Sequence, residues 1–354
     1  MKNFCKKLIL TIFCLAVFCS TQALAKKNIA IIATGGTIAG VGDSSYASKY
    51  SAGKITIDQI IESNPKLNDL ANLKGEQLLQ MASENMDDDS WLTIARRVSA
   101  LLSSSKVDGV VITHGTDTIE ETAYFLSLTI NSKKPIILVG AMRPSSSTSA
   151  DGPLNLYNAI AVATSDDAKN KGALVIFNDR IYTARDVAKT HTTNVAAFES
   201  PNFGPIGIVN YGKALFYYNP LRLHTANSKF NIKNIKSLPR VDILYGHAGQ
   251  DETVIDHLVK TGTKAIVFAG VGDGNIHKAA LEKLINARKE NNLILLRSSR
   301  TGAGFVVRNA EIEDDKNDFV TADNLSPQKA RILLKLALTK TNNTKKIQEI
   351  FSIY

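Results

Sequence analysis

Short apolar runs alternate with amphipathic stretches along the first half of the chain. The runs are rich in β-branched residues and cover residues 29–33, 109–113, 135–140 and 173–177. The stretches between them repeat apolar positions at the spacing of a helix, over residues 90–102, 119–130 and 154–164. Strands that are apolar on both faces and separated by helices indicate an α/β fold built on a mostly parallel sheet.

The pattern changes near residue 205. Residues 206–209 and 214–218 flank an Asn-Tyr-Gly turn and predict a hairpin. Residues 219–239 are polar, with a proline near each end, and predict a linker. A second α/β pattern follows, with strand-like residues 241–245, 265–269 and 293–297 and helix-like residues 251–261, 278–291 and 327–339. We therefore expect a larger N-terminal α/β domain with a mostly parallel sheet over residues 26–218 and a smaller C-terminal α/β domain over residues 240–354.

Residues 1–25 differ from both domains. Three lysines precede an apolar run over residues 8–18, and the segment ends in Ala-Leu-Ala at residues 23–25. This is the pattern of a secretory signal peptide, and the run is shorter than the ~20 residues that span a bilayer. We expect cleavage after Ala25, a periplasmic protein of 354 − 25 = 329 residues, and no membrane segment after cleavage. Cleavage would remove every cysteine, so we expect neither a disulfide nor a thiol nucleophile.

Composition narrows the classes of partner and cofactor. Hydrophobic residues make up 44% of the chain and charged residues 21%, which is ordinary for a globular protein. Without the three leader lysines the net charge is (42 − 3) − 33 = +6, and this excess is spread thinly, so we expect no nucleic-acid partner. The six histidines form no close pair at the spacing of metal ligands, so we predict no metal, and we expect His114 to be a structural residue of a turn.

Two predicted strands end in loops rich in glycine and hydroxyl groups. The first loop is residues 34–37 (Thr-Gly-Gly-Thr), and the second loop is residues 114–118 (His-Gly-Thr-Asp-Thr). Open α/β sheets bind ligands beyond the carboxyl ends of their strands. The glycines let the backbone approach a ligand and leave N–H groups for an oxyanion, while Thr37 and Thr116 are candidate nucleophiles and Asp117 can bind a cation. Either loop alone is more often ordinary turn chemistry, but two in one domain favour a catalytic site.

At these loops the chain resembles the bacterial L-asparaginase family. The matching segments are residues 33–40 (Ala-Thr-Gly-Gly-Thr-Ile-Ala-Gly) and 112–118 (Ile-Thr-His-Gly-Thr-Asp-Thr). Further similar segments lie at residues 74–77, 140–144, 149–153, 297–300 and 348–354, so the resemblance covers essentially the whole chain after residue 25. The presence of a signal peptide points to the periplasmic type II branch of the family, which includes the glutaminase-asparaginases. The resemblance implies that the protein hydrolyses L-asparagine to L-aspartate and ammonia through an acyl-threonine intermediate, without a cofactor, and hydrolyses L-glutamine as a secondary substrate.

The resemblance also implies a role for individual residues. The residues expected to act in catalysis are Thr37, Tyr50, Thr116, Asp117 and Lys189. The residues expected to bind the substrate are Ser83, Glu84, Thr116, Asp117 and Glu311. Thr37 would be the nucleophile, and Tyr50 would help to activate it. Glu311 would come from a neighbouring subunit, because the family forms homotetramers whose sites are shared between subunits.

Elementary chemistry fits these roles. An amide is a poor electrophile, so its hydrolysis without a metal needs an activated hydroxyl and a site for the oxyanion. A threonine hydroxyl is too weak an acid to attack at neutral pH, and a lysine can take its proton only if burial lowers the lysine pKa well below ~10.4 or if a second hydroxyl relays the proton. Residues 40–53 are rich in glycine and serine, which predicts a mobile lid over the substrate. The sequence does not decide which threonine attacks first.

Two alternatives remain. Glu84 stands where many relatives have Gln, and Gly249 stands where asparagine-selective relatives have an Asn that reaches a neighbouring site, so one alternative is a glutamine-preferring glutaminase-asparaginase. The other is a periplasmic amino-acid-binding protein, which also has two α/β domains and a signal peptide but needs no nucleophile. One methylene is worth only about 1–3 kcal/mol of discrimination, so we expect asparagine to be favoured over glutamine by about one to two decades in kcat/KM.

Overall fold

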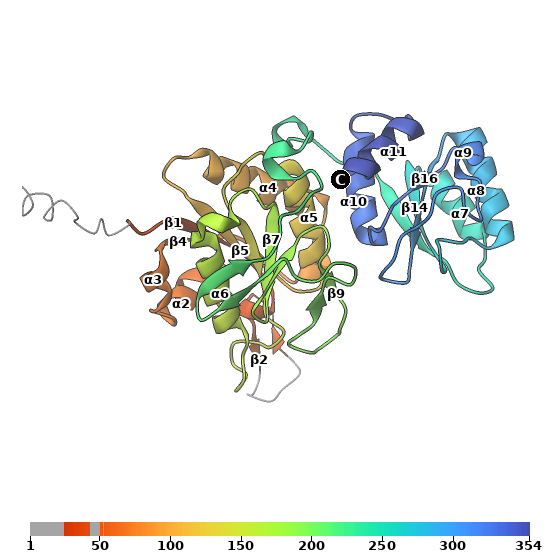
Figure 1. Cartoon of the computed structure of the whole chain (residues 1–354). Coiled ribbons are helices and arrows are strands. Elements are labelled where there is room, and N and C mark those ends of the chain that lie inside the picture. The colour runs from red at the N-terminus through yellow and green to blue at the C-terminus, as the bar shows by residue number, and fades with distance from the viewer. Residues whose placement is uncertain (1–24, 43–49, 52) are drawn as a thin grey trace, which may run out of the picture.

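The computed structural model describes residues 25–42, 50, 51 and 53–354. The chain forms a larger N-terminal α/β domain and a smaller C-terminal α/β domain (Figure 1), which confirms the predicted fold class. Residues 1–24 of the expected signal peptide, with all three cysteines, lie outside the described residues. Within the described ranges, we find no helix that is long and apolar enough to cross a membrane.

An eight-stranded sheet forms the centre of the N-terminal domain, in the order β12-β11-β8-β7-β6-β5-β1-β4. Five neighbouring strands, from β7 to β4, run parallel, and the other three join through antiparallel pairs. The strands are β1 (Asn28–Gly35), β4 (Asn72–Met81), β5 (Gly109–Thr113), β6 (Ile136–Val139), β7 (Ala173–Phe177), β8 (Arg180–Thr183), β11 (Gly207–Asn210) and β12 (Lys213–Phe216). The predicted parallel strands and the predicted hairpin, formed by β11 and β12, are therefore confirmed.

Helices cover both faces of this sheet. The side chains of β5 alternate between two layers, because Ile112 belongs to a hydrophobic cluster with α4 and α5, whereas Val111 belongs to a cluster with α6. A strand covered on both faces has no solvated side, which explains why β5 is apolar at nearly every position. The helices of this domain are α2 (Ile57–Glu62), α3 (Leu67–Leu70), α4 (Asp88–Ser103), α5 (Ile119–Thr129) and α6 (Gly152–Thr164).

A four-stranded parallel sheet forms the centre of the C-terminal domain, in the order β13-β14-β15-β16. The strands are β13 (Val241–Tyr245), β14 (Ala265–Gly270), β15 (Ile294–Ser299) and β16 (Val320–Thr321). The helices are α7 (Thr253–Lys260), α8 (Lys278–Asn291), α9 (Asp314–Asn317), α10 (Pro327–Leu338) and α11 (Thr344–Ile353). Helix α10 packs against both β13 and α5, so it lies at the junction of the domains (Figure 1). One hydrophobic cluster consequently runs from the N-terminal sheet into the C-terminal sheet.

Residues 219–239 connect the two domains. They contain two short 3₁₀ turns, Thr225–Asn227 and Ile232–Asn234, and no longer regular element. Three of their apolar side chains, Phe230, Ile232 and Ile235, are buried in the cluster that contains α4. The connection is therefore packed against the N-terminal domain, although its sequence is mostly polar.

Candidate active site

The two loops touch at the carboxyl edge of the main sheet. They follow β1 and β5, which are neighbouring parallel strands. Thr34 Oγ1 donates a hydrogen bond to the Thr113 carbonyl at 2.9 Å. Gly36 lies so close to the second loop that a Cβ on it would be 2.4 Å from the Gly115 nitrogen, and its φ of 80° is in the left-handed region. Glycine is therefore required at position 36 both by the close approach and by the backbone conformation.

Thr37 is buried, with 6% of its surface exposed, and it begins a 3₁₀ turn, Thr37–Ala39. The Gly40 N–H donates to the Thr37 carbonyl at 2.8 Å, and the Gly53 N–H donates to the Gly36 carbonyl at 3.1 Å. These bonds join the first loop to both ends of the segment that is predicted to be a lid. Its short strands β2 (Val41–Gly42) and β3 (Tyr50–Ser51) pair with each other.

The structure describes only part of the predicted lid, residues 40–53. Residues 43–49 and residue 52 lie outside the described residues. Tyr50 is placed by its backbone in β3, and its side chain is outside the described part of the chain. The lid and the role of Tyr50 therefore stay predictions.

Ser83 contacts the second loop from a 3₁₀ turn, Ser83–Asn85, that follows β4. Its Oγ accepts a hydrogen bond from the Asp117 N–H at 3.2 Å, and its carbonyl accepts one from Thr118 Oγ1 at 2.8 Å. A Cβ on Gly115 would lie 2.4 Å from Ser83 Oγ, which again requires glycine in the second loop. Glu84, the next residue, is exposed. The structure thus brings Ser83 to the second loop, and Glu84 follows it in the same turn.

Lys189 reaches the second loop from a different part of the fold. It lies in β9 (Ala188–Lys189), which pairs with β10 (Phe198–Glu199). Its Nζ is 3.0 Å from Thr116 Oγ1 and 2.6 Å from Asp117 Oδ1. The side chain of Lys189 is 15% exposed, and that of Asp117 is 58% exposed. Thr116, Asp117 and Lys189, called the relay residues below, therefore form one hydrogen-bonded group whose carboxylate faces solvent.

His114 lies fully buried beneath the second loop. Its Nδ1 lies 2.8 Å from the Gly115 carbonyl, which can only accept, so Nδ1 carries the proton. Its Nε2 then accepts from Thr122 Oγ1 at 2.9 Å, and Thr122 Oγ1 accepts from Trp91 Nε1 at 3.1 Å. Burial lowers the pKa of His114 to about 4, which matches a neutral ring. The expectation that this histidine is structural agrees with these contacts.

Glu311 lies on the C-terminal domain, just before α9, whereas the two loops belong to the N-terminal domain (Figure 1). Its carboxylate accepts a hydrogen bond from Asn275, a residue of the same domain. The segment around it is anchored by Arg297, whose guanidinium donates to Asp314 Oδ1 and Oδ2 at 2.7 Å and to the Val307 carbonyl at 3.0 Å. Glu311 therefore lies in an anchored segment of the C-terminal domain, whereas the two loops belong to the N-terminal domain.

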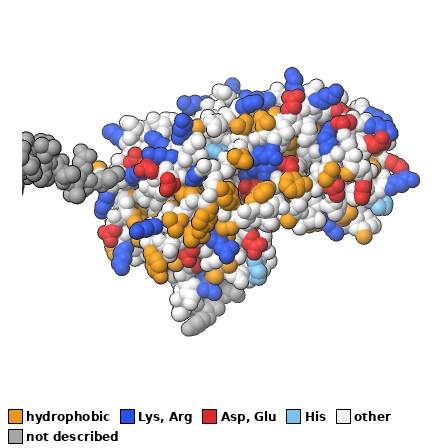
Figure 2. Space-filling model, viewed as in Figure 1, with side chains coloured by type: hydrophobic (Ala, Val, Ile, Leu, Met, Phe, Trp, Pro, Cys, Tyr) orange, Lys and Arg blue, Asp and Glu red, His pale blue; other side chains and the backbone are white. Residues whose placement is uncertain are grey.

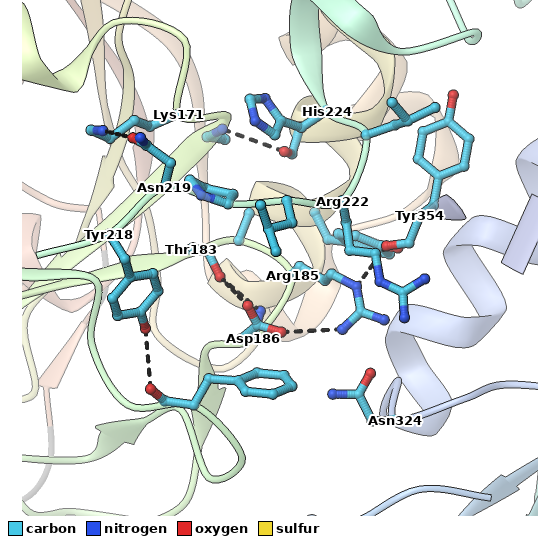
Figure 3. A pocket seen from close by; sticks show the side chains of 18 of the residues that line it. Lys171, Thr183, Arg185, Asp186, Tyr218, Asn219, Arg222, His224, Asn324 and Tyr354 are labelled. Atoms are coloured by element: carbon cyan, nitrogen blue, oxygen red, sulfur yellow. Dashed lines mark hydrogen bonds and ion pairs between the residues drawn. The ribbon is translucent and has the colours of Figure 1, made fainter. Parts of the chain in front are cut away.

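A cavity of about 350 Å³ lies at the junction of the two domains (Figure 3). The described residues that line it include Arg185, Asp186 and Tyr354, but none of the expected site residues. Arg185 Nε donates to the main-chain oxygen of Tyr354 at 2.6 Å, and Arg185 Nη1 lies 3.2 Å from Asp186 Oδ1. The cavity is thus beside the chain segment that leads to Lys189. Across the described ranges, no group of three or more His, Cys, Asp or Glu side chains could hold a metal ion.

Comparisons with known proteins cover the same two domains. The family model described as "Asparaginase, N-terminal" matches residues 28–222, and the model described as "Glutaminase/Asparaginase C-terminal domain" matches residues 240–351. "Probable L-asparaginase periplasmic" of Haemophilus influenzae is 48% identical over 92% of this chain and 92% of that protein. "Glutaminase-asparaginase" of Pseudomonas fluorescens biotype A is 49% identical over 92% of this chain and 90% of that protein.

A solved structure agrees with the fold. "Crystal Structure of Probable Cytoplasmic L-asparaginase from Campylobacter jejuni" matches with a TM-score of 0.90 and 50% identity, over 93% of this chain and 100% of that chain. The likeness thus extends over both sheets and over the loops at the edge of the larger one.

Proposed function

The chain belongs to the asparaginase family, and from this membership we propose that it hydrolyses L-asparagine to L-aspartate and ammonia, and L-glutamine more slowly, through an acyl-threonine intermediate. The observation that carries the proposal is the hydrogen-bonded group of Thr116, Asp117 and Lys189 beside the loop of Thr37. An amino-acid-binding protein has no use for a lysine directed at a threonine hydroxyl. The small-molecule substrate and the amidohydrolase class follow from the family.

Thr37 supplies the nucleophilic hydroxyl in this proposal. The contact between Gly36 and Gly115 holds the loops of Thr37 and Thr116 against each other. As Thr37 attacks the amide carbon, its proton passes to Thr116, and Thr116 passes its own proton to Lys189 across the 3.0 Å contact. Lys189 and Thr116 then pass this proton to the amide nitrogen, which leaves as ammonia when its bond to the carbonyl carbon breaks. A water molecule attacks the acyl carbon, its proton returns to the Thr37 oxygen, and the bond between that oxygen and the acyl group breaks.

Asp117 binds the ammonium group of the substrate. Its carboxylate has 58% of its side chain exposed, so it is accessible to a ligand while it is still paired with Lys189. The same carboxylate therefore contacts both the substrate ammonium and Lys189, and it links substrate binding to the relay residues. Ser83 and Glu84 contact the rest of the amino-acid head group.

Purified protein tests this function directly. We expect ammonia release from L-asparagine, slower release from L-glutamine, and no effect of a metal chelator on either rate. Thr37→Ala should abolish the release while asparagine still binds, as measured by calorimetry. Binding of either amino acid without any ammonia release by the unaltered protein would instead support the binding-protein alternative.

We further propose a homotetramer in which Glu311 of one subunit completes the site of another. Exposed apolar side chains support a subunit contact, among them Phe203, Tyr217, Leu221 and Phe305, of which Leu221 is 97% exposed. Figure 2 shows apolar side chains gathered along the middle of the visible face. A sedimentation experiment at micromolar concentration tests the tetramer. A mixture of inactive Glu311→Ala and Thr37→Ala proteins should regain activity if the sites are shared, because some sites then receive both intact residues.

We also propose periplasmic secretion with cleavage after Ala25, and domain limits of 26–218 and 240–354 with residues 219–239 as the linker. The leader pattern supports secretion, as does the name of the Haemophilus influenzae relative, while the Campylobacter jejuni protein is described as cytoplasmic. The family models support the limits, since one ends at residue 222 and the next begins at residue 240. Intact mass of the secreted protein tests the processing, and we expect Lys26 as the first residue.

A further inference from the structure

Lys329 is a charged side chain buried at the domain junction. It is 2% exposed and lies in the first turn of α10. Its Nζ donates to the Arg185 carbonyl at 3.0 Å and to the Val187 carbonyl, and it lies 3.5 Å from Glu120 Oε2. The two carbonyl oxygens accept hydrogen bonds from this ammonium group, and the Glu120 carboxylate balances its charge at ion-pair distance.

These three partners belong to the two chain segments that carry the relay residues. Arg185 and Val187 directly precede β9, in which Lys189 lies. Glu120 is in the first turn of α5, which begins immediately after the second loop with Thr116 and Asp117. One ammonium group from the C-terminal domain therefore binds both segments whose side chains meet in the active site.

Other contacts fix the segment before Lys189 from the same side. The Arg185 guanidinium donates to the main-chain oxygen of Tyr354 at 2.6 Å (Figure 3). It also lies 3.5 Å from Asp323 Oδ2, and both partners belong to the C-terminal domain. Thr183 Oγ1 donates to Asp186 Oδ2 at 2.6 Å and closes the turn after β8. Residues 185–187 are thus fixed both through the side chains of Arg185 and Asp186 and through the backbone carbonyls that Lys329 binds.

We infer that Lys329 is a positioning residue for amide hydrolysis, which holds Lys189 at the distance from Thr116 and Asp117 that proton transfer needs. The inference rests on the proposed function. Stability alone does not explain a buried ion pair, because apolar residues of similar volume are often as stabilising or more so. The placement of Lys189 does explain the ion pair, because a shift of about 1 Å in a catalytic group can lower the rate on the order of 10²-fold.

The test variant must remove the charge of both partners. Lys329→Met alone would leave the Glu120 carboxylate buried without a cation, which is strongly destabilising. Lys329→Met with Glu120→Gln keeps the volume, removes both charges and leaves the two backbone carbonyls without their ammonium donor. A matched control exists on the same helix, since Lys335 is 3% exposed and lies 2.6 Å from Asp88 of α4. Lys335→Met with Asp88→Asn removes a similar ion pair between α10 and the N-terminal domain. The partner in this pair lies in α4, which carries none of the relay residues.

Steady-state kinetics with asparagine are measured for the full-length mature protein, well below the Tm of each variant. For Lys329→Met/Glu120→Gln we expect kcat to fall about 10–100-fold and KM to change less than about threefold, because Ser83 still fixes Asp117. For Lys335→Met/Asp88→Asn we expect kcat within about twofold of the unaltered protein. This split between kcat and KM, with the control unaffected, would not arise from a merely structural role.

Full kcat in the folded Lys329→Met/Glu120→Gln protein would overturn the inference, and so would an equal loss in both double variants. If the test variant does not fold, Glu120→Gln alone takes its place, with an expected kcat loss of at least about threefold; an unchanged kcat would overturn the inference. An unaltered protein that releases no ammonia from either amide would overturn the proposed function and this inference with it. An active unaltered protein with a fully active test variant would overturn this inference alone.

Discussion

Lys189 Nζ lies 2.6 Å from Asp117 Oδ1, so the lysine is paired with the carboxylate that we expect to bind the substrate. Asp117→Asn would remove the partner of the lysine and of the substrate ammonium together. A charged hydrogen bond is worth about 1.5–3 kcal/mol, so we expect KM for asparagine to rise roughly 10–100-fold, and kcat to fall as well. Steady-state kinetics check both values. Asp167→Asn removes the same charge from an exposed turn and should leave both unchanged.

The two threonines can be separated by trapping the intermediate. Thr37→Ala should lower kcat by at least about 10³-fold, and Thr37→Ser should retain part of the activity, because a hydroxyl remains. Thr116→Ala should also be severe, and the double variant little worse than either single one, because residues that act as a unit are not additive. Rapid acid quench and peptide mass spectrometry should find the aspartyl group on Thr37. An aspartyl group on Thr116 would reverse the assignment.

Gly249 offers a test of substrate preference. Its φ of 66° is in the left-handed region, and a Cβ there would have no atom within 4 Å among the described residues, so an Asn side chain has room. Asn tolerates this conformation better than most residues. We expect Gly249→Asn to lower kcat/KM for glutamine at least about tenfold more than for asparagine, by restoring a polar contact to the neighbouring site. Gly249→Ala carries more backbone strain and no amide, so an equal or larger shift in that variant would contradict the role of the amide.

His114 predicts a pH dependence of stability. Its pKa is about 4 when folded, against an ordinary value of 6.5, because burial disfavours the charged ring. As the pH falls from 6.5 to about 4, the unfolded chain gains a proton that the folded chain does not, so the free energy of unfolding decreases. The loss at pH 4.5, relative to pH 7, should be roughly 2–3 kcal/mol greater than in His114→Asn. Urea unfolding at fixed protein concentration measures it, and parallel curves for the two proteins would contradict the assignment.

The sequence predicts the buried strands well, because a strand covered on both faces has a nearly continuous apolar run. It does not predict β4, although this strand has ten residues and pairs with β1 along its length. β4 is an edge strand without a single buried residue, and it carries Lys74 and Glu76, so no apolar run marks it. Edge strands are often polar, since exposed apolar edges promote aggregation.

The residues of the candidate site also divide into those that a sequence pattern predicts and those that it does not. Thr37, Thr116 and Asp117 can be predicted because each follows a recognisable strand in a glycine-rich loop. Lys189 comes from the resemblance alone, since a two-residue strand after a turn has no pattern of its own. The burial of Lys329 and Glu120 could not be predicted from the sequence, because a charged residue within a helical pattern is usually solvated. Only the packing of α10 against α5 shows that both are buried.

Gly36 and Gly115 restrict how this enzyme can change. Their backbones touch, and any side chain at either position would overlap main-chain atoms or Ser83. A random library that varies the two loops therefore loses nearly every member that alters either glycine, whatever the selection. Specificity has to be altered through residues outside this contact, such as Glu84 and Gly249. Evolution faces the same limit, so substrate preference in this chain can drift while the backbone beneath the chemistry stays the same.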